Sequence, residues 1–241
     1  MLVTTKAIVI STLRYQEKSL IVKCFTESDG LKSYFIRDAF SSRKTAQKIA
    51  YFQPLNILEI EALHKNKGSL EYFKEVRLGH PYHSVTTNIT KTSIALFISE
   101  MLHHSIKEEE KNQALYSFLE TALLWLDSHD EVANFHLILL LEVTKFLGFY
   151  PEAGHNSHDY FEMTEGVFIP FESLSCLSAA DTALLRRLMA LRLDNAVKVF
   201  HVSERQALLK ILMDYYAFHL DDFKRPKSLE VLKDIFSAPG S

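Results

Sequence analysis

Hydrophobic and polar residues alternate along short runs in the first third of the chain. Five such runs, rich in β-branched and aromatic residues and separated by turn residues, lie between residues 3 and 78. In the last run Leu70, Tyr72, Val76 and Leu78 share one side, which only Lys74 interrupts. Residues of equal parity in a strand point to the same face. The pattern therefore predicts five strands with one buried and one solvated face.

The hydrophobic period changes to about 3.6 residues after the turn at residues 79–81. Apolar residues then recur at helical spacing through residues 94–126 and again through residues 184–236, which predicts amphipathic helices. The segment 135–147 is apolar on nearly every side, as expected for a helix at the centre of a bundle. Gly148 directly after it is a typical helix end.

Residues 151–178 break this helical pattern with glycines and a proline, and two short apolar pieces within them predict a small hairpin. His155, His158 and Cys176 lie in the same stretch, and zinc accepts such donors. A closed zinc site needs about four ligands, usually as two close pairs. Because Cys176 has no His or Cys within four residues, the sequence predicts an insert without metal, whose loop histidines are solvated.

Together these patterns predict an α+β protein in three parts. Residues 1–79 form a five-stranded barrel of the OB type, residues 80–150 and 179–241 form an all-α helical domain, and residues 151–178 form the insert. Five short strands with a basic surface and many aromatic rings are typical of OB-type barrels, which commonly bind oligonucleotides in a groove over their strands.

Charge is distributed unevenly along the 241 residues. The whole chain has 27 Lys+Arg and 30 Asp+Glu, a net charge of -3, but residues 1–80 hold 13 and 8, a net charge of +5. Two cysteines are too few for a disulfide framework, and no stretch has the features of a secretory signal. No apolar run approaches the roughly 20 residues of a spanning helix. These features predict a soluble, cytoplasmic protein without membrane association.

The basic surface of the N-terminal part is a candidate DNA-binding site. Lys and Arg along a groove neutralise phosphates and release condensed counterions, while exposed rings stack on bases. The candidate cations are Lys6, Arg14, Lys18, Lys23, Lys32, Arg37, Arg43, Lys44 and Lys48. The candidate exposed rings are Tyr15, Tyr34 and Phe40. The rings predicted to lie in the core are Phe25, Phe35 and Phe73.

Other functions remain open at this stage. Any soluble barrel needs charged outward residues, so the same surface also fits an interaction scaffold that contacts proteins. Adjacent His103 and His104, with Glu100 nearby, point to different sides of a helix and need no metal to explain them. A metal-dependent hydrolase using His155 and His158 lacks a third close ligand and an evident general base. With no phosphate-binding glycine loop or nucleophile elbow, the sequence favours a binding protein without enzymatic activity or cofactor.

Residues 7–40, AIVISTLRYQEKSLIVKCFTESDGLKSYFIRDAF, carry a family pattern on the first hairpin. Its matching positions are Arg14, Tyr15, Glu17, Ile21, Val22, Phe25, Thr26, Gly30 and Leu31. With AYFQPLNILEIEAL, LLLEVTKFLGFYPE and RPKSLEVLKDI further along, the chain resembles the RecO family of bacterial DNA repair and recombination mediators. It departs from that family at Gln16, where the pattern has Gly, and at Arg37-Asp38, where it has Lys-Gly.

The resemblance implies a non-enzymatic protein that binds single- and double-stranded DNA and anneals complementary strands. It also implies partners: RecR, with which such proteins place RecA on DNA, and single-strand binding protein, whose C-terminal tail docks on the helical domain. Many family members carry a four-cysteine zinc module after the central helix. Residues 151–178 lack those cysteines, so the resemblance implies a degenerate module held by apolar packing of aromatic side chains. These are Tyr160, Phe161, Phe168 and Phe171.

Overall fold

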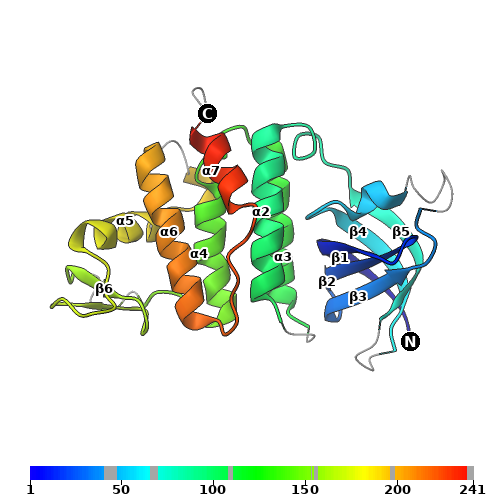
Figure 1. Ribbon diagram of the computed structural model, residues 1–241, viewed down its shortest axis with the longest axis horizontal. Coiled ribbons are helices and arrows are strands. Elements are labelled where there is room, and N and C mark those ends of the chain that lie inside the picture. Colours follow the sequence, from blue (N-terminus) through cyan, green and yellow to red (C-terminus); the bar gives the residue numbers. More distant parts are fainter. Residues whose placement is uncertain are drawn as a thin grey trace. The chain divides into compact units, whose positions relative to one another are not determined.

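The computed structural model describes residues 1–40, 48–65, 70–107, 111–152, 154, 157–195 and 199–237. The chain forms two compact units, an N-terminal unit, Met1–Ser128, and a C-terminal unit, His129–Ser241, with elements labelled in Figure 1. The domain boundaries predicted from sequence, at residues 79, 150 and 178, were placed where the hydrophobic period changes, whereas the two units are defined by their internal contacts. The predicted boundaries stay a prediction. Within the described ranges, no helix combines the length and the apolar character that crossing a membrane requires.

An antiparallel sheet of five strands opens the N-terminal unit, as the alternation predicted. The strands are β1 (Leu2–Tyr15), β2 (Ser19–Thr26), β3 (Gly30–Ile36), β4 (Ile57–Leu63) and β5 (Tyr72–His80). Their order is β3-β2-β1-β4-β5, so the central strand β1 pairs with both β2 and β4. A short 3-10 helix, η1 (Ala50–Phe52), lies between β3 and β4 along the chain. Strands followed by helices confirm the α+β class.

The sheet curls without closing into a complete barrel. Among the described residues its edge strands meet at one parallel bridge, between Tyr34 of β3 and Glu71, which directly precedes β5. There the N–H of Phe35 donates to the carbonyl oxygen of Glu71 at 2.9 Å, and the N–H of Glu71 donates to that of Ser33 at 2.8 Å. The predicted OB-type barrel is therefore corrected to an open sheet. We call the gap beyond this bridge, between residues 35–37 and 72–76, the seam.

A bulge in β5 changes which of its side chains are buried. The register of β4 against β5 shifts at Lys74, which is the extra residue, and an extra residue reverses the alternation beyond it. Phe73 therefore packs, partly buried, against the core of the sheet and stacks on Tyr34 with ring centroids 4.1 Å apart, whereas Tyr72 is 41% exposed. The prediction that Tyr72 and Val76 share one buried face is wrong for this reason.

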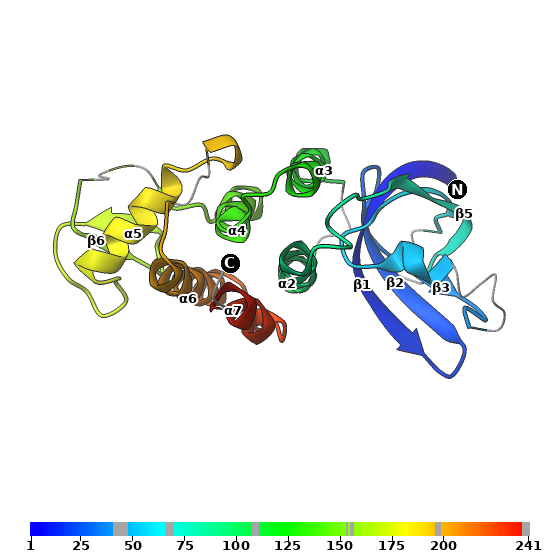
Figure 2. The same cartoon turned by 90° about the horizontal axis from the view of Figure 1, so that it is seen from above.

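Two helices pack on the sheet within the N-terminal unit (Figure 2). They are α2 (Ile89–Ser105) and α3 (Gln113–Ser128). From α2 the hydroxyl of Ser99 donates to the carbonyl oxygen of Ile10 in β1 at 2.7 Å. From α3 the ring of Tyr116 lies 6.2 Å from that of Phe25 in β2. The compact unit thus continues well beyond the change of hydrophobic period at residue 79.

A buried carboxylate fixes the connection between β5 and α2. Asp127 of α3 accepts hydrogen bonds from the N–H groups of His83, Ser84 and Val85 at 3.0, 2.8 and 3.1 Å. Burial disfavours the charged form, but these donors outweigh it and lower the pKa of Asp127. The buried ammonium of Lys91 donates to the Ser84 hydroxyl at 2.7 Å and to the Asp127 carbonyl oxygen at 3.1 Å. The sheet, α2 and α3 are therefore joined as one body.

The C-terminal unit consists of helices and a hairpin. Its elements are α4 (Phe135–Leu147), β6 (Tyr160–Glu162), β7 (Val167–Ile169), α5 (Ala179–Met189), η2 (Leu193–Asn195), α6 (Val202–His219) and α7 (Leu229–Ser237). α4 is buried along most of its length, and the Tyr216 hydroxyl of α6 donates to the Leu140 carbonyl oxygen at 2.8 Å. Gly148, with φ +85°, ends α4 in a conformation that favours glycine. The predicted central helix is confirmed.

The hairpin predicted within residues 151–178 is formed by β6 and β7. Phe161 is fully buried, with its ring 5.1 Å from Phe168 and 5.7 Å from Tyr215 of α6. Phe171, in contrast, is 80% exposed. The hairpin is therefore packed on α6 through Phe161, and the expectation that Phe171 contributes to this packing is wrong.

A buried carboxylate organises the loops around the hairpin. Glu162 accepts hydrogen bonds from the Thr164 hydroxyl at 2.9 and 2.8 Å, from the Ser175 hydroxyl, and from the N–H of Glu165 at 2.7 Å. Burial disfavours the charge of Glu162, but these hydrogen bonds outweigh it and lower its pKa. The loop on either side of β6 and β7 is thus held by polar contacts to one side chain.

Candidate nucleic-acid interface

Three aromatic rings form a row on the same face of the sheet as Phe25, near the start of β2 and away from the contact of Phe25 with α3. Tyr15 at the end of β1 and Tyr72 at the start of β5 lie on either side of Phe35 in β3, with centroid separations of 6.1 and 6.3 Å and interplanar angles of 81° and 85°. Tyr15 is 44% exposed. We call these three residues the aromatic row. Their exposed surfaces are available to a flat ligand.

The register of the strands explains why the row faces solvent. Leu13, Ile21 and Phe35 lie opposite one another in β1, β2 and β3, and directly paired residues share a face. Tyr15, two residues after Leu13, shares this face as well. Leu13 is 62% exposed. The sheet therefore presents an uncovered apolar patch beside the aromatic row.

A hydrogen-bonded chain holds the end of β4 next to the row. The Tyr34 hydroxyl lies 2.8 Å from His64 Nε2, and His64 Nδ1 lies 3.2 Å from the Asp29 carboxylate. An ionised carboxylate only accepts, so we assign Nδ1–H as the donor to Asp29, which leaves Nε2 to accept from the Tyr34 hydroxyl. The next residue, Lys65, donates its N–H to both carboxylate oxygens of Glu71 at 2.9 Å. These bonds fix the backbone of Lys65.

Cations stand next to the exposed rings. The ammonium of Lys65 lies 5.3 Å from the ring centroid of Tyr72, and the guanidinium of Arg14 lies 4.8 Å from that of Phe40. A cation over a ring is worth about 0.5–1 kcal/mol at exposed sites, which is enough to keep charge and ring together. Lys18 is exposed in the turn after β1. Positive charge and stacking surface thus coincide at this end of the sheet.

Not all of the predicted cations lie on this face. Lys6 is engaged with Glu120 of α3 in an ion pair of 2.9 Å. Lys32 pairs with Cys24 and lies two residues before the buried Tyr34 in β3, so it belongs to the opposite face from Phe35 and the aromatic row. Lys23 shares the face of the row but lies towards α2, where burial and the charge of Lys23 lower the pKa of His103. The predicted cations therefore do not line a single groove.

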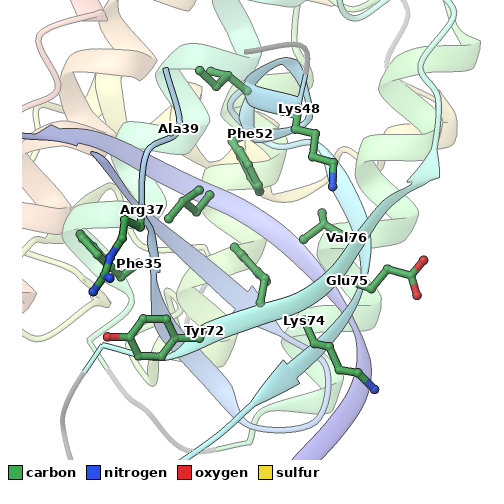
Figure 3. A pocket seen from close by; sticks show the side chains of 12 residues that line it. Phe35, Arg37, Ala39, Lys48, Phe52, Tyr72, Lys74, Glu75 and Val76 are labelled. Carbon is green, nitrogen blue, oxygen red and sulfur yellow. The ribbon is translucent and has the colours of Figure 1, made fainter. Parts of the chain in front are cut away.

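The seam holds a pocket of about 360 Å³. It is lined by Phe35, Ile36, Arg37, Ala39, Lys48, Ile49, Phe52, Tyr72, Phe73, Lys74, Glu75 and Val76. In the view of Figure 3, Arg37 and Lys48 lie on opposite sides of the ring of Phe52. Arg43 and Lys44, which the sequence placed with them, lie outside the described residues.

Two ring assignments made from sequence are wrong. Tyr34, expected on the surface, is fully buried, and Phe35, expected in the core, belongs to the aromatic row. Neighbouring strand residues face opposite sides, so one ring of each doublet, Tyr34-Phe35 and Tyr72-Phe73, has to face outward. A pair of adjacent aromatic residues in a strand is thus the sequence signal that could have identified Phe35 and Tyr72 as outward-facing rings. Lys65 offered no comparable signal.

The possible metal ligands of the insert are engaged in other contacts. The Cys176 thiol donates to the Ser173 carbonyl oxygen at 3.2 Å, and His158 Nδ1 lies 3.1 Å from the Phe168 carbonyl oxygen. His155 lies outside the described residues. In the part of the chain that the structure describes, no three His, Cys, Asp or Glu side chains come together as a metal site would require. That the insert binds no zinc stays a prediction.

Comparison with known proteins gives matches along the whole chain. The family model described as Recombination protein O N terminal matches residues 1–82, and the one described as Recombination protein O C terminal matches residues 86–230. The chain is 64% identical over 238 residues to the DNA repair protein RecO of Flavobacterium psychrophilum. It is 40% identical over 238 residues to that of Christiangramia forsetii and 36% identical over 247 residues to that of Phocaeicola vulgatus. Each match covers 98% of this chain and 100% of the relative.

Proposed function

The chain belongs to the RecO family of DNA repair proteins, and from that premise we propose that it is a DNA-binding recombination mediator without a catalytic step of its own. It binds single- and double-stranded DNA through the N-terminal sheet and anneals complementary strands. With RecR it places RecA on DNA coated by single-strand binding protein, whose C-terminal tail is a second partner. These partners rest on the family membership alone.

The aromatic row is the observation that carries the DNA-binding proposal. Base-to-ring stacking is worth about 1–3 kcal/mol per base and tolerates any sequence, because every base has a flat face. Tyr15, Phe35 and Tyr72 succeed one another across three strands, which suits consecutive unpaired bases. Lys65, next to the ring of Tyr72, supplies charge for the backbone between the bases.

A protein-interaction scaffold is the second candidate, and one observation favours it. Leu13 and Ile21 extend the exposed face with apolar side chains, and an uncovered apolar patch is also a typical protein contact. In that case DNA association would arise through a partner. Salt dependence separates the two, because phosphate contacts release counterions and apolar contacts do not.

The decisive test is a salt-titrated binding curve of the purified chain with a single-stranded oligonucleotide. The slope of log K against log salt is about -0.7 per neutralised phosphate, so roughly four to six contacts predict a slope of about -3 to -4. A flat response, with DNA retained only when RecR is added, would favour the scaffold.

A ring deletion tests the site itself. Tyr72→Ala should weaken single-strand binding by about 5- to 150-fold, the equivalent of one stacked base. Phe218→Ala is the matched control, because Phe218 is an exposed ring in the C-terminal unit. Equal affinity of the two variants would remove the aromatic row from the interface.

A further inference from the structure

We propose that the seam pocket takes one unpaired nucleobase of single-stranded DNA, with the flanking phosphates on Arg37 and Lys48. This inference rests on the proposed function and adds a defined subsite to it. The aromatic row provides flat surfaces on the outside of the sheet. The seam provides a concave site, which a base can enter only after it unstacks from the neighbouring bases of the strand.

The size and lining of the pocket fit a flat, partly polar ligand. Its volume of about 360 Å³ lies in the range of roughly 300–1,000 Å³ that small-molecule pockets occupy. Phe52 and Phe73 contribute rings that are stacked on each other, with centroids 5.6 Å apart and planes 16° from parallel. Phe73 is stacked in turn on Tyr34. An ordered stack of rings is therefore already in place beside the space that a base would fill.

The open strand edges supply hydrogen-bonding groups. β3 and β5 are the edge strands of the sheet, and an edge strand presents backbone N–H and C=O groups on its unpaired side. Beyond the bridge at Tyr34 and Glu71, these two edges face the pocket through residues 35–37 and 72–76. Backbone donors and acceptors can form hydrogen bonds with the polar edge of any base, so they do not select one base over another.

The charge around the pocket selects an anionic ligand. In the described residues, neither Arg37 nor Lys48 forms an ion pair, and both are exposed. Glu75 also lines the pocket, but its carboxylate accepts hydrogen bonds from Arg77 at 3.1 and 2.7 Å, which lower its pKa. Lys74 is likewise paired with Glu61 at 2.7 Å. Arg37 and Lys48, on opposite sides of the opening, match the two phosphates that flank a nucleotide, although the charge of Lys48 also contributes to lowering the pKa of Glu75.

This arrangement favours single strands over duplexes. A paired base has to unstack and unpair before it reaches a pocket, at a cost of a few kcal/mol. An extended peptide is the rival occupant, because it could pair with the same strand edges. We favour the base because Arg37 and Lys48 place positive charge on both sides of the opening.

Crosslinking of the unaltered chain locates the base directly. A single-stranded oligonucleotide containing iododeoxyuridine is bound, irradiated and digested, and the adducts are mapped by mass spectrometry. Adducts on Phe52 or Phe73 are expected, since these rings line the pocket and lie outside the aromatic row. Adducts confined to the aromatic row, with none on Phe52 or Phe73, would overturn the subsite.

Filling the pocket tests the same inference by affinity. Val76→Trp and Ile36→Trp place an added ring in the pocket from β5 and β3, and Thr4→Trp is the control, at an exposed position of β1. For a filling variant whose circular dichroism matches wild type, single-strand affinity should fall by about 5- to 150-fold, the loss of one stacked base. Affinity for duplex DNA should be unchanged.

Failure of the subsite and failure of the proposed function give different results. Folded filling variants that bind single strands like wild type would overturn the subsite but leave salt-dependent DNA binding intact. If those variants bound single strands normally but no longer bound RecR, the seam would be a peptide site, and the nucleobase proposal would be wrong. A wild-type chain that shows no salt-dependent binding would overturn the function itself. If neither filling variant folds, the crosslink map decides.

Discussion

Removing the ring of Phe161 should destabilise the C-terminal unit strongly. The side chain is fully buried and contacts the rings of Phe168 and Tyr215. Its backbone ties the hairpin to the next helix as well, because its N–H donates to the Thr182 hydroxyl at 3.0 Å and its carbonyl oxygen accepts from the N–H of Leu177 at 2.8 Å. Phe161→Ala leaves these backbone bonds possible but opens a cavity between hairpin and α6.

The size of the effect follows from this burial. A buried Phe→Ala change costs about 3–5 kcal/mol. For a chain of this size each kcal/mol corresponds to roughly 2–4 °C in Tm, so Phe161→Ala should melt about 6–20 °C lower. Phe171→Ala is the matched control in the same insert. Since Phe171 is 80% exposed, its loss should change the free energy of unfolding by less than about 0.5 kcal/mol.

The assay is thermal and denaturant unfolding of the full chain, followed by far-ultraviolet circular dichroism with and without a chelator. Packing rather than metal should hold the insert, so the chelator should leave the wild-type Tm unchanged. Equal melting of Phe161→Ala and Phe171→Ala would refute the packing argument, and the insert would then be better described as a loop. A chelator-sensitive wild type would refute the metal-free account.

Glu162, three candidate cations within residues 43–48 and the insert each give a further expected outcome. Glu162→Gln should cost about 1–3 kcal/mol at neutral pH. Folding lowers the pKa of Glu162 below its ordinary 4.5. The ionised carboxylate therefore stabilises the fold fully above pH 4.5, and this stabilisation is lost as pH falls through the lower pKa of the folded state. In thermal melts, the difference in Tm between Glu162→Gln and wild type should accordingly shrink in acid. Charge reversal to Glu at three cations should weaken single-strand binding by fluorescence anisotropy while Tm stays within a few degrees, and unchanged affinity would place the interface elsewhere. These cations are Arg43, Lys44 and Lys48. Elemental analysis of protein purified without added metal should find no stoichiometric zinc; zinc that disappears on mutation of His158 would contradict this.

Local periodicity was sufficient to predict the elements of the fold. Alternation identified five strands, and an apolar segment without a polar face identified α4 as buried. The exposed face of β5 was not predictable in this way, because the bulge at Lys74 depends on the register against β4. Register is a property of two strands, so the sequence of one strand does not reveal it.

The candidate site was predicted in its chemistry more than in its residues. Counting charges located a basic region but could not say that Lys6 is engaged with Glu120 of α3, more than a hundred residues later. Likewise, composition could not show that Tyr34 turns inward to meet His64. Contacts between distant segments decide which cations and rings remain available, and those contacts exist only in the folded chain.

The joining of α2 and α3 to the sheet determines how this protein can be divided for experiments. Ile8 and Ile10 of β1 are fully buried although neither belongs to the core cluster within the sheet, so the helices must cover them. A fragment that stops near residue 82 would uncover these side chains and leave Lys91 and Asp127 behind, and such surfaces promote aggregation. An expression fragment of the N-terminal sheet should therefore extend to Ser128.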